Sequence, residues 1–397
     1  MWKLPAGAEF VLRRLGEAGY QGYVVGGCVR DTLLGKKPKD WDVCTNALPH
    51  EMQRVFADCH VIETGLQHGT LTVMYRHEPF EVTTFRVDGE YTDHRHPDEV
   101  IFVADVRDDL SRRDFTVNAM AWSPETGVVD AFGGQEDLDK QLIRCVGEPE
   151  KRFGEDALRI MRALRFASVY GFAIDPATDA AIHVLKDTLT DVAAERIRVE
   201  LQKLLCGDGA GDILRAYPDV LQVIMPQLAK VDWLTTVAAV EKAPATEIMR
   251  LTMLLHQLSP ADAKAVLVAL KPDNFTRDRV LTLVTNEAYP FQPTRHSLLT
   301  ALSLFGEEVV RQLLAVRQAK GMMDCDVLCN VLEAVLADGV CFNVKDMAIN
   351  GRDLMALGAR GKAVGECLSH LLSLLLAEKL PNERECLLEA AKVHLGE

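Results

Sequence analysis

Two adjacent glycines and two closely spaced aspartates near the N-terminus have the residue types for phosphate chemistry. Gly26 and Gly27 stand next to each other, and Asp40 and Asp42 follow with one residue between them. A glycine pair lets the backbone approach a polyanion with no side chain in the way. Aspartates two residues apart on a β-strand point to the same face of a sheet. This combination suits a triphosphate held over a pair of divalent metal ions, and it favours an enzyme that transfers nucleotides.

Asp40 and Asp42 are therefore the candidate catalytic residues and metal ligands. Nucleotidyl transfer commonly uses two metal ions about 3.5–4 Å apart, and Mg²⁺ prefers oxygen ligands while it keeps several waters. We expect a third catalytic acid on a neighbouring strand, and Glu81, between the apolar Phe80 and Val82, fits that position. Two alternatives stay open: Asp40 as the cap of a turn, and Glu81 as a solvent-facing strand residue.

Arg30 lies three residues beyond the glycine pair, at the start of a short helical pattern. A guanidinium at this place could bind a phosphate through two parallel hydrogen bonds. Arg30 is therefore a candidate nucleotide-binding residue. An ion pair with Asp31 or Asp42 is the alternative that the sequence leaves open.

The elements that would position these residues change in kind near residue 150. Before this point, short β-rich runs alternate with turn signals and with helical patterns. The β-rich runs cover residues 23–25, 71–75 and 80–85. Such an alternation predicts a small α+β domain with one mixed sheet.

After residue 150 the strand signals nearly vanish, and amphipathic patterns replace them. These patterns predict helices over residues 157–170, 177–186 and 193–206. A glycine-rich stretch at residues 207–211 interrupts the pattern and predicts a junction. Beyond it the sequence is rich in Leu and Ala, and no proline occurs between Pro293 and Pro381, so long helices are expected there.

Composition and charge limit the class of protein. A chain of 397 residues is too long for one compact core and predicts several domains. The net charge of −14 weighs against a general nucleic-acid binder, although a local basic track remains compatible with it. Ten scattered cysteines lack the spacing of a zinc site and are expected to be reduced, buried thiols. The absence of a long apolar stretch and of an apolar signal core predicts a cytoplasmic protein with no membrane partner.

Several motifs, in a fixed order, resemble those of one enzyme family. Residues 26–31 (GGCVRD), together with Asp40 and Asp42, resemble the first motif of the class II tRNA nucleotidyltransferases and bacterial poly(A) polymerases. Residues 112–120 (RRDFTVNAM) resemble the second motif of that family.

Two further segments extend the resemblance. Residues 155–159 (EDALR), continuing to Arg162 and Arg165, resemble the nucleotide-reading motif. Near the C-terminus, residues 349–355 resemble a segment of the bacterial CCA-adding enzymes, whereas residues 210–340 carry no recognisable motif.

The resemblance implies an α+β nucleotidyltransferase head with one mixed sheet, followed by an all-α neck, body and tail. We expect the catalytic head in residues 1–148 and the nucleotide-reading helical neck in residues 149–206. The helical body would then cover residues 207–320, and a helical tail that binds tRNA would cover residues 321–397.

The resemblance also implies an activity, which is the addition of C, C and A to the 3′ end of tRNA. The substrates would be CTP and ATP, pyrophosphate would be released, and no nucleic-acid template would be used. Asp40 and Asp42 would bind Mg²⁺. The nucleotide-binding residues implied in this way are Gly27, Arg30, Arg113, Asp156, Arg159, Arg162 and Arg165.

An enzyme without a template must read the base with side chains. Asp156 can accept hydrogen bonds and Arg159 can donate them, and cytosine and adenine both present an amino group beside a ring nitrogen acceptor. A spacing of three residues on the predicted helix would make these two side chains neighbours. Glu155 would hold Arg159 in place. Arg162 could reach the same ligand, while Arg165 has an alternative role as an ion pair that joins neck and head.

Arg113 is the candidate from the second motif for contact with the triphosphate or the ribose. Arg112 is the competing choice in the arginine pair. We favour Arg113 because it lies directly against the Asp-Phe-Thr core of the motif.

Residues 88–109 are expected to form a long loop without secondary structure of its own, because residues 93–99 are too polar to pack. In the resembling enzymes a mobile segment here is needed to add the final A. Its presence favours the full CCA activity over addition of C and C alone.

Three alternatives remain beside the CCA-adding enzyme. Within the family, these are a poly(A) polymerase and a partial enzyme that adds only A or only C and C. A non-catalytic tRNA-binding protein is the alternative from another class, although it would not need two close carboxylates. The oligomeric state stays open, with a homodimer as one option.

Overall fold

The computed structural model describes residues 2–89 and 100–396. The chain forms two compact units. The first contains the residues up to Ala229 together with Ala269–Lys271, and the second contains Lys230–Val268 and the residues from Pro272 onward. All ten cysteines are free thiols, and most of them are buried.

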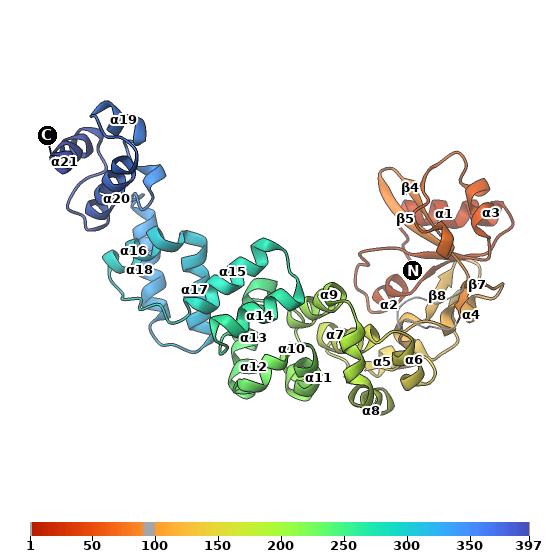
Figure 1. Ribbon diagram of the computed structural model, residues 1–397. Coiled ribbons are helices and arrows are strands. Elements are labelled where there is room, and N and C mark those ends of the chain that lie inside the picture. The colour runs from red at the N-terminus through yellow and green to blue at the C-terminus, as the bar shows by residue number, and fades with distance from the viewer. Residues whose placement is uncertain (1, 90–99, 397) are drawn as a thin grey trace. The chain divides into compact units, whose positions relative to one another are not determined.

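A mixed sheet of seven strands forms the centre of the N-terminal part of the first unit (Figure 1). The strands lie in the order β3-β4-β5-β2-β1-β8-β9. Their bounds are β1 Gly22–Val25, β2 Val43–Thr45, β3 His60–Ile62, β4 Thr70–Tyr75, β5 Glu78–Thr84, β8 Met120–Ser123 and β9 Gly127–Asp130. β2 and β5 run parallel, and the other neighbours run antiparallel. The predicted α+β head with a mixed sheet is confirmed.

Helix α1, Ala6–Glu17, packs against this sheet through one apolar face. Its buried residues recur at the spacing of helical turns and include Ala8, Val11, Leu12 and Leu15. The helix approaches β5 so closely that a Cβ on Gly7 would lie 2.1 Å from the Phe80 ring. Glycine at position 7 therefore permits the contact between helix and sheet.

Short α-helices complete the described part of the head. They are α2 Gly27–Leu33, α3 Pro49–Val55, α4 Val106–Ser111 and α5 Gly134–Asp139. The expectation of an unstructured loop over residues 88–109 is wrong for its described part. β6, Arg86–Asp88, pairs with β7, Val100–Phe102, and α4 follows directly after them. The polar centre at residues 93–99 lies outside the described residues.

The remainder of the first unit is almost entirely helical, as the amphipathic patterns predicted. Its helices are α6 Pro149–Glu155, α7 Leu158–Tyr170, α8 Pro176–Leu185, α9 Ala194–Leu205, α10 Ala210–Ala216 and α11 Pro218–Ile224. α7 packs along α9, and Ser168 Oγ donates to the carbonyl oxygen of Leu204 at 2.7 Å. A parallel pair of two-residue strands, β10 Leu142–Ile143 and β11 Ala173–Ile174, joins the head to this helical part.

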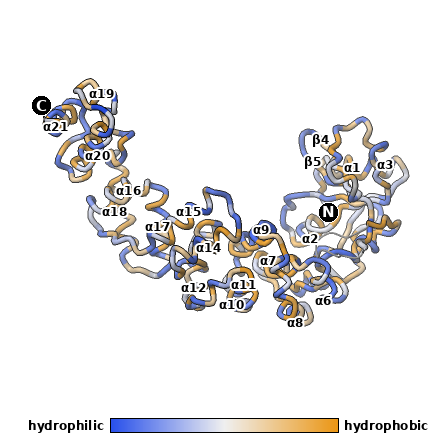
Figure 2. Tube along the Cα trace, viewed as in Figure 1, coloured by the Kyte–Doolittle hydropathy of each residue, from blue (hydrophilic) through white to orange (hydrophobic). Residues whose placement is uncertain are grey.

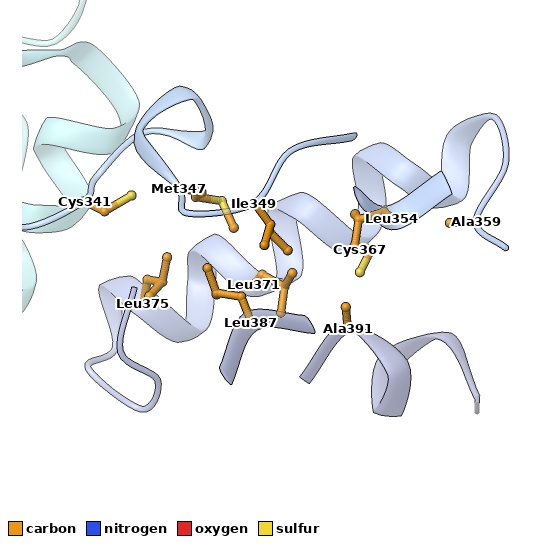
Figure 3. Close-up of a cluster of buried hydrophobic side chains, with 10 residues drawn as sticks. All are labelled: Cys341, Met347, Ile349, Leu354, Ala359, Cys367, Leu371, Leu375, Leu387 and Ala391. Atoms are coloured by element: carbon orange, nitrogen blue, oxygen red, sulfur yellow. The ribbon is translucent and has the colours of Figure 1, made fainter. Parts of the chain in front are cut away.

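The second unit contains helices and no strand among its described residues. The helices are α12 Trp233–Lys242, α13 Glu247–Leu255, α14 Pro260–Leu270, α15 Asn274–Thr285, α16 Arg295–Phe305, α17 Glu307–Ala319, α18 Cys325–Ala337, α19 Gly351–Ala356, α20 Lys362–Leu376 and α21 Arg384–Leu395. Near the C-terminus, buried apolar side chains of α19, α20 and α21 converge on a core that includes Leu354, Leu371 and Leu387 (Figure 3).

Apolar and polar residues alternate along the helices of both units (Figure 2), which is the pattern of helices with one buried face. Within residues 2–89 and 100–396, no helix is both long enough and apolar enough to span a bilayer.

Candidate active site

The turn between β1 and α2 is built on Gly26. Its φ of 80° and ψ of −126° are readily adopted only by glycine. A Cβ at this position would lie 2.7 Å from Nη1 of Arg113. The backbone conformation therefore requires glycine here, and a side chain would also displace the Arg113 guanidinium. The sequence pointed to Gly27, where a Cβ would make only an ordinary contact at 3.5 Å with Arg30, so binding by Gly27 stays a prediction.

Asp40 and Asp42 lie just before β2, which begins at Val43. The prediction that both residues belong to a strand is therefore wrong. The backbone hydrogen bonds of the sheet nevertheless extend to Asp42, because the carbonyl oxygen of Asp42 accepts a hydrogen bond from the backbone N–H of Val25 at 3.0 Å. Both carboxylates are exposed to solvent. The register of the parallel pair β2–β5, with Val43 opposite Val82, sets Glu81 beside Asp42. The third acid thus stands on the neighbouring strand, as predicted, and its side chain is exposed.

The carboxyl group of Asp42 is affected by the negative charges of two other acidic side chains. Desolvation by the surrounding protein raises the pKa of its carboxyl, and the charges of Glu81 and Asp40 raise it further. The guanidinium of Arg113 acts in the opposite direction and only partly offsets them. A cluster of carboxylate oxygens with incomplete charge compensation fits a hard divalent cation such as Mg²⁺.

No group of three His, Cys, Asp or Glu side chains within residues 2–89 and 100–396 is arranged to hold a metal ion by itself. Two carboxylates suffice for Mg²⁺ because this ion keeps several of its waters and takes further oxygens from a bound phosphate. The donor set of Asp40 and Asp42 therefore fits the ion that the sequence resemblance implies.

The two arginines of the second motif share one carboxylate, that of Asp109 in α4. Arg112 donates to Oδ1 of Asp109 through Nη2 at 2.9 Å, and Arg113 donates to Oδ2 at 3.3 Å. Asp109 is fully buried. Burial alone would raise the pKa of its carboxyl, but the charges of Arg113 and Arg112 outweigh burial and hold the pKa below its ordinary value. Asp109 thus fixes the arginine that faces Gly26. The sequence analysis missed this residue, although its spacing of three and four residues from the arginines is a helical signal.

Arg30 is buried and fully engaged within the protein. Its Nε and Nη2 donate to Oδ1 of Asp31 at 2.9 and 2.8 Å, and its Nη1 donates to Oδ1 of Asn118. The guanidinium also lies over the Tyr170 ring, with its central carbon 4.6 Å from the ring centroid. The structure therefore has the ion pair with Asp31 that the sequence left open. Phosphate binding by Arg30 remains a prediction.

A chain of polar contacts runs from Arg30 to the helix α7. Asn118 accepts from Arg30 and donates through Nδ2 to Oδ1 of Asp114 at 3.1 Å. Arg162 donates to Oδ2 of the same carboxylate through Nε at 2.8 Å and Nη2 at 2.5 Å. Burial raises the pKa of Asp114, but Arg162 and Asn118 more than reverse this effect and lower it to about 2. The second motif and the nucleotide-reading motif are therefore joined through a buried, charged residue.

Asp156 does not stand on a helix, which corrects the sequence prediction. Its φ of −146° and ψ of 102° are extended, and it separates α6 from α7. Its Oδ1 accepts from the N–H of Leu158, the first residue of α7, at 3.1 Å. Arg196, on α9, donates to Oδ2 of Asp156 at 2.7 Å. The sequence analysis missed Arg196, because nothing local connects residues 40 positions apart.

Arg159 is held as the sequence analysis suggested. Its Nη1 donates to Oε2 of Glu155 at 2.5 Å and to the carbonyl oxygen of Arg152 at 2.9 Å. Its Nη2 donates to the carbonyl oxygen of Arg112 at 3.2 Å, so the side chain also contacts the second motif. This contact brings the nucleotide-reading motif to the head.

Arg165 forms an ion pair with Glu200 of α9, with 2.5 Å between Nε and Oε2. The alternative that the sequence analysis gave, an ion pair between neck and head, is wrong, since both partners lie on packed helices of the neck. Arg165 also lies over the Phe166 ring at 3.8 Å from the centroid. The ion pair with Glu200 joins α7 to α9.

The predicted residues thus fall into two connected groups within the first unit. In the first, the charges of Asp40, Glu81 and Arg113 act on Asp42, and Arg113 also lies against Gly26. Asp156, Arg159, Arg162 and Arg165 gather at α7 and its start, and Arg30 links the groups through Asn118 and Asp114.

Three family models match successive parts of the chain. Residues 22–144 match the family model of the poly A polymerase head domain. Residues 171–231 match the model described as the probable RNA and SrmB-binding site of polymerase A, and residues 243–391 match the putative tRNA nucleotidyltransferase domain 2.

Full-length relatives carry the comparison further. A CCA-adding enzyme of Leuconostoc citreum is 36% identical, with 97% of this chain and 95% of the relative aligned. A CCA-adding enzyme of Levilactobacillus brevis is also 36% identical, over 96% of both proteins. The crystal structure of the Bacillus stearothermophilus CCA-adding enzyme in complex with CTP has a TM-score of 0.84 and 31% identity, covering 99% of this chain and 98% of that one. The Thermotoga maritima CCA-adding enzyme complexed with tRNA shares the fold, with a TM-score of 0.67 at 22% identity, covering 98% of this chain and 94% of that one. The chain therefore belongs to the family of CCA-adding tRNA nucleotidyltransferases.

Proposed function

We propose that this protein adds C, C and A in turn to the 3′ end of tRNA, using CTP and ATP and releasing pyrophosphate. The observation that carries the proposal is the contact between Arg159 and the carbonyl oxygen of Arg112 at 3.2 Å. It joins a side chain that can read a base to the motif beside the acidic cluster. Base selection and nucleotidyl transfer at one place are what a polymerase without a template requires.

Asp40 and Asp42 would hold the Mg²⁺ ions, with Glu81 as the third acid beside them. When bound, such ions would neutralise the triphosphate and favour deprotonation of the tRNA 3′ hydroxyl. Arg113 faces the glycine turn and would donate hydrogen bonds to triphosphate oxygens. Gly27, which opens α2, has no side chain and would let the backbone approach the same ligand.

Base choice would rest on Asp156 and Arg159. The carboxylate accepts from the exocyclic amino group of cytosine or adenine, and the guanidinium donates to the neighbouring ring nitrogen. Uracil and guanine present a carbonyl oxygen where the amino group should be, and an unpaired polar group of this kind is rejected strongly. Arg162, Arg165 and Arg30 would support the nucleotide from positions already fixed by their acidic partners.

The division into a head over residues 1–148, a neck over 149–206, a body over 207–320 and a tail over 321–397 is part of the same proposal. The tail would contact tRNA. We also propose a cytoplasmic location, since ten free cysteines suit a reducing compartment.

Incubation of the protein with a tRNA that lacks its 3′ CCA, Mg²⁺ and each nucleoside triphosphate tests the proposal. Addition of two C residues followed by a single A is the expected result. A long run of A would identify a poly(A) polymerase, and C,C or A alone would identify a partial enzyme. Retention of tRNA without any incorporation would identify a non-catalytic binding protein.

A further inference from the structure

Arg196 of α9 binds the carboxylate of Asp156 through both terminal nitrogens of its guanidinium. Nη2 lies 2.7 Å from Oδ2, and Nη1 lies 3.3 Å from Oδ1. The pair is largely shielded from water, since the Arg196 and Asp156 side chains keep 28% and 17% of their surface exposed. A forked contact of this kind fixes the plane of a carboxylate as well as its position.

The hydrogen bonds of Asp156 leave one acceptor position of its carboxylate for a further donor. A carboxylate offers about four lone-pair positions, two on each oxygen. Oδ1 uses both of its positions, one for Arg196 and one for the backbone N–H of Leu158 at 3.1 Å. Oδ2 uses one for Arg196. In the part of the chain that the structure describes, no other hydrogen-bond donor reaches Oδ2, so a single position remains, and it suits a single amino group.

Asp156 needs this support because of its place in the chain. Its extended backbone interrupts the helical run between α6 and α7, so a regular helix does not direct its side chain. α9 itself is firmly seated against α7 by the ion pair of Arg165 with Glu200 and by the hydrogen bond from Ser168 to Leu204. Arg196 therefore holds the Asp156 carboxylate at a fixed position relative to α9, although Asp156 itself lies outside a helix.

We propose that Arg196 is a positioning residue that determines base specificity, because it presents the one free acceptor position of Asp156 to the exocyclic amino group of cytosine or adenine. This inference rests on the proposed function. Without the fork, the carboxylate can rotate and offer a different edge, and the distinction between an amino group and a carbonyl oxygen is weakened. Arg196 itself does not touch the nucleotide.

The experiment compares Arg196→Met, which keeps the length of the side chain, and Arg196→Lys, which keeps the charge but not the fork. The ratio of kcat/KM for CTP over UTP is measured on tRNA lacking CCA. The ratio for ATP over GTP is measured on tRNA ending in CC. We expect Arg196→Met to lower both ratios at least tenfold and Arg196→Lys to lower them by an intermediate factor. Lys203→Met, an exposed position on the same helix, is the control and should leave both ratios unchanged.

A double-mutant cycle with Asp156→Asn separates positioning from a structural role. If Arg196 acts through Asp156, adding Arg196→Met to Asp156→Asn should change the ratios less than twofold. Additive losses, or a fall in kcat with both ratios intact in folded variants, would overturn the inference. Failure of the wild type and of Lys203→Met to add C, C and A would instead refute the proposed function.

Discussion

Arg162 of α7 and the buried Asp114 of the second motif form an ion pair in which Nε and Nη2 lie 2.8 and 2.5 Å from the same carboxylate oxygen. The two residues are 48 positions apart, and each belongs to a different sequence motif. Their pairing links the sheet domain to α7, the helix that carries Arg159.

Asp114→Asn should destabilise the protein by about 2 kcal/mol at neutral pH, because the lowered pKa of Asp114 reflects favourable charge interactions in the folded state. The folded pKa is about 2 and the ordinary value is 3.8, so this stabilisation is present above pH 3.8 and is lost as the pH falls toward 2. Chemical unfolding of wild type and variant at a series of pH values measures the difference.

Asp212→Asn provides the matched control for that experiment. Asp212 forms an ion pair with Arg215, but its side chain is 85% exposed, and exposed pairs contribute little. A wild-type curve that stays parallel to the Asp114→Asn curve between pH 4 and pH 2 would contradict the assignment.

Asp40→Ala or Asp42→Ala should abolish nucleotide transfer while tRNA still binds. Loss of several kcal/mol of transition-state stabilisation corresponds to a decrease in kcat on the order of a thousandfold. Incorporation assays together with filter binding of tRNA measure both quantities. Chelation of divalent ions should likewise stop wild-type incorporation, and added Mg²⁺ should restore it. Substantial transfer by either variant would show that these carboxylates are not the metal ligands.

Asp156→Ala should relax base choice more than it slows the reaction. The variant loses the acceptor that favours an amino group, so UTP and GTP should be used with kcat/KM values that approach those for CTP and ATP, a change of about ten- to a hundredfold in the ratio. Competition assays with mixed triphosphates measure this ratio. A variant that remains as selective as the wild type would exclude Asp156 from base reading.

Gly26→Ala should impair folding and catalysis together. The positive φ costs about 1 kcal/mol or more for a residue with a side chain, and the new methyl group would also displace Arg113, which lies 2.7 Å from the Cβ position. Gly35→Ala separates the two effects, because Gly35 also has a positive φ of 67° but no atom within 4 Å of a Cβ. Both variants should lose stability, and only Gly26→Ala should lose activity at temperatures where it is folded. Equal activities would contradict a role for the Arg113 position.

Much of this architecture could be predicted from local sequence patterns. The change from β-rich runs to amphipathic helices near residue 150 reflects side-chain periodicity, and the helix predicted over residues 157–170 matches α7, Leu158–Tyr170. Asp156 was wrongly placed on that helix, because no proline marks the break before it. The strand β2 was expected to include Asp42 but begins one residue later, at Val43.

Local sequence patterns could not predict the ion pairs. Asp114 with Arg162, Asp156 with Arg196 and Arg165 with Glu200 are each separated by 35 residues or more, and only the folded chain brings them together. Arg162, Arg165 and Asp156 could be recognised as binding candidates by type and motif. Their partners Asp114, Glu200 and Arg196 could not, because any of 58 acidic or 44 basic residues could have supplied them.

Glu155 and two carbonyl oxygens restrain the Arg159 side chain. This restraint affects how quickly one nucleotide addition can follow another. A free arginine side chain loses up to about 2 kcal/mol of rotational entropy when it becomes ordered. Here that ordering is completed during folding of the chain, before any nucleotide arrives. Each of three successive cycles on one tRNA can then begin from the same conformer, with little reorganisation between them.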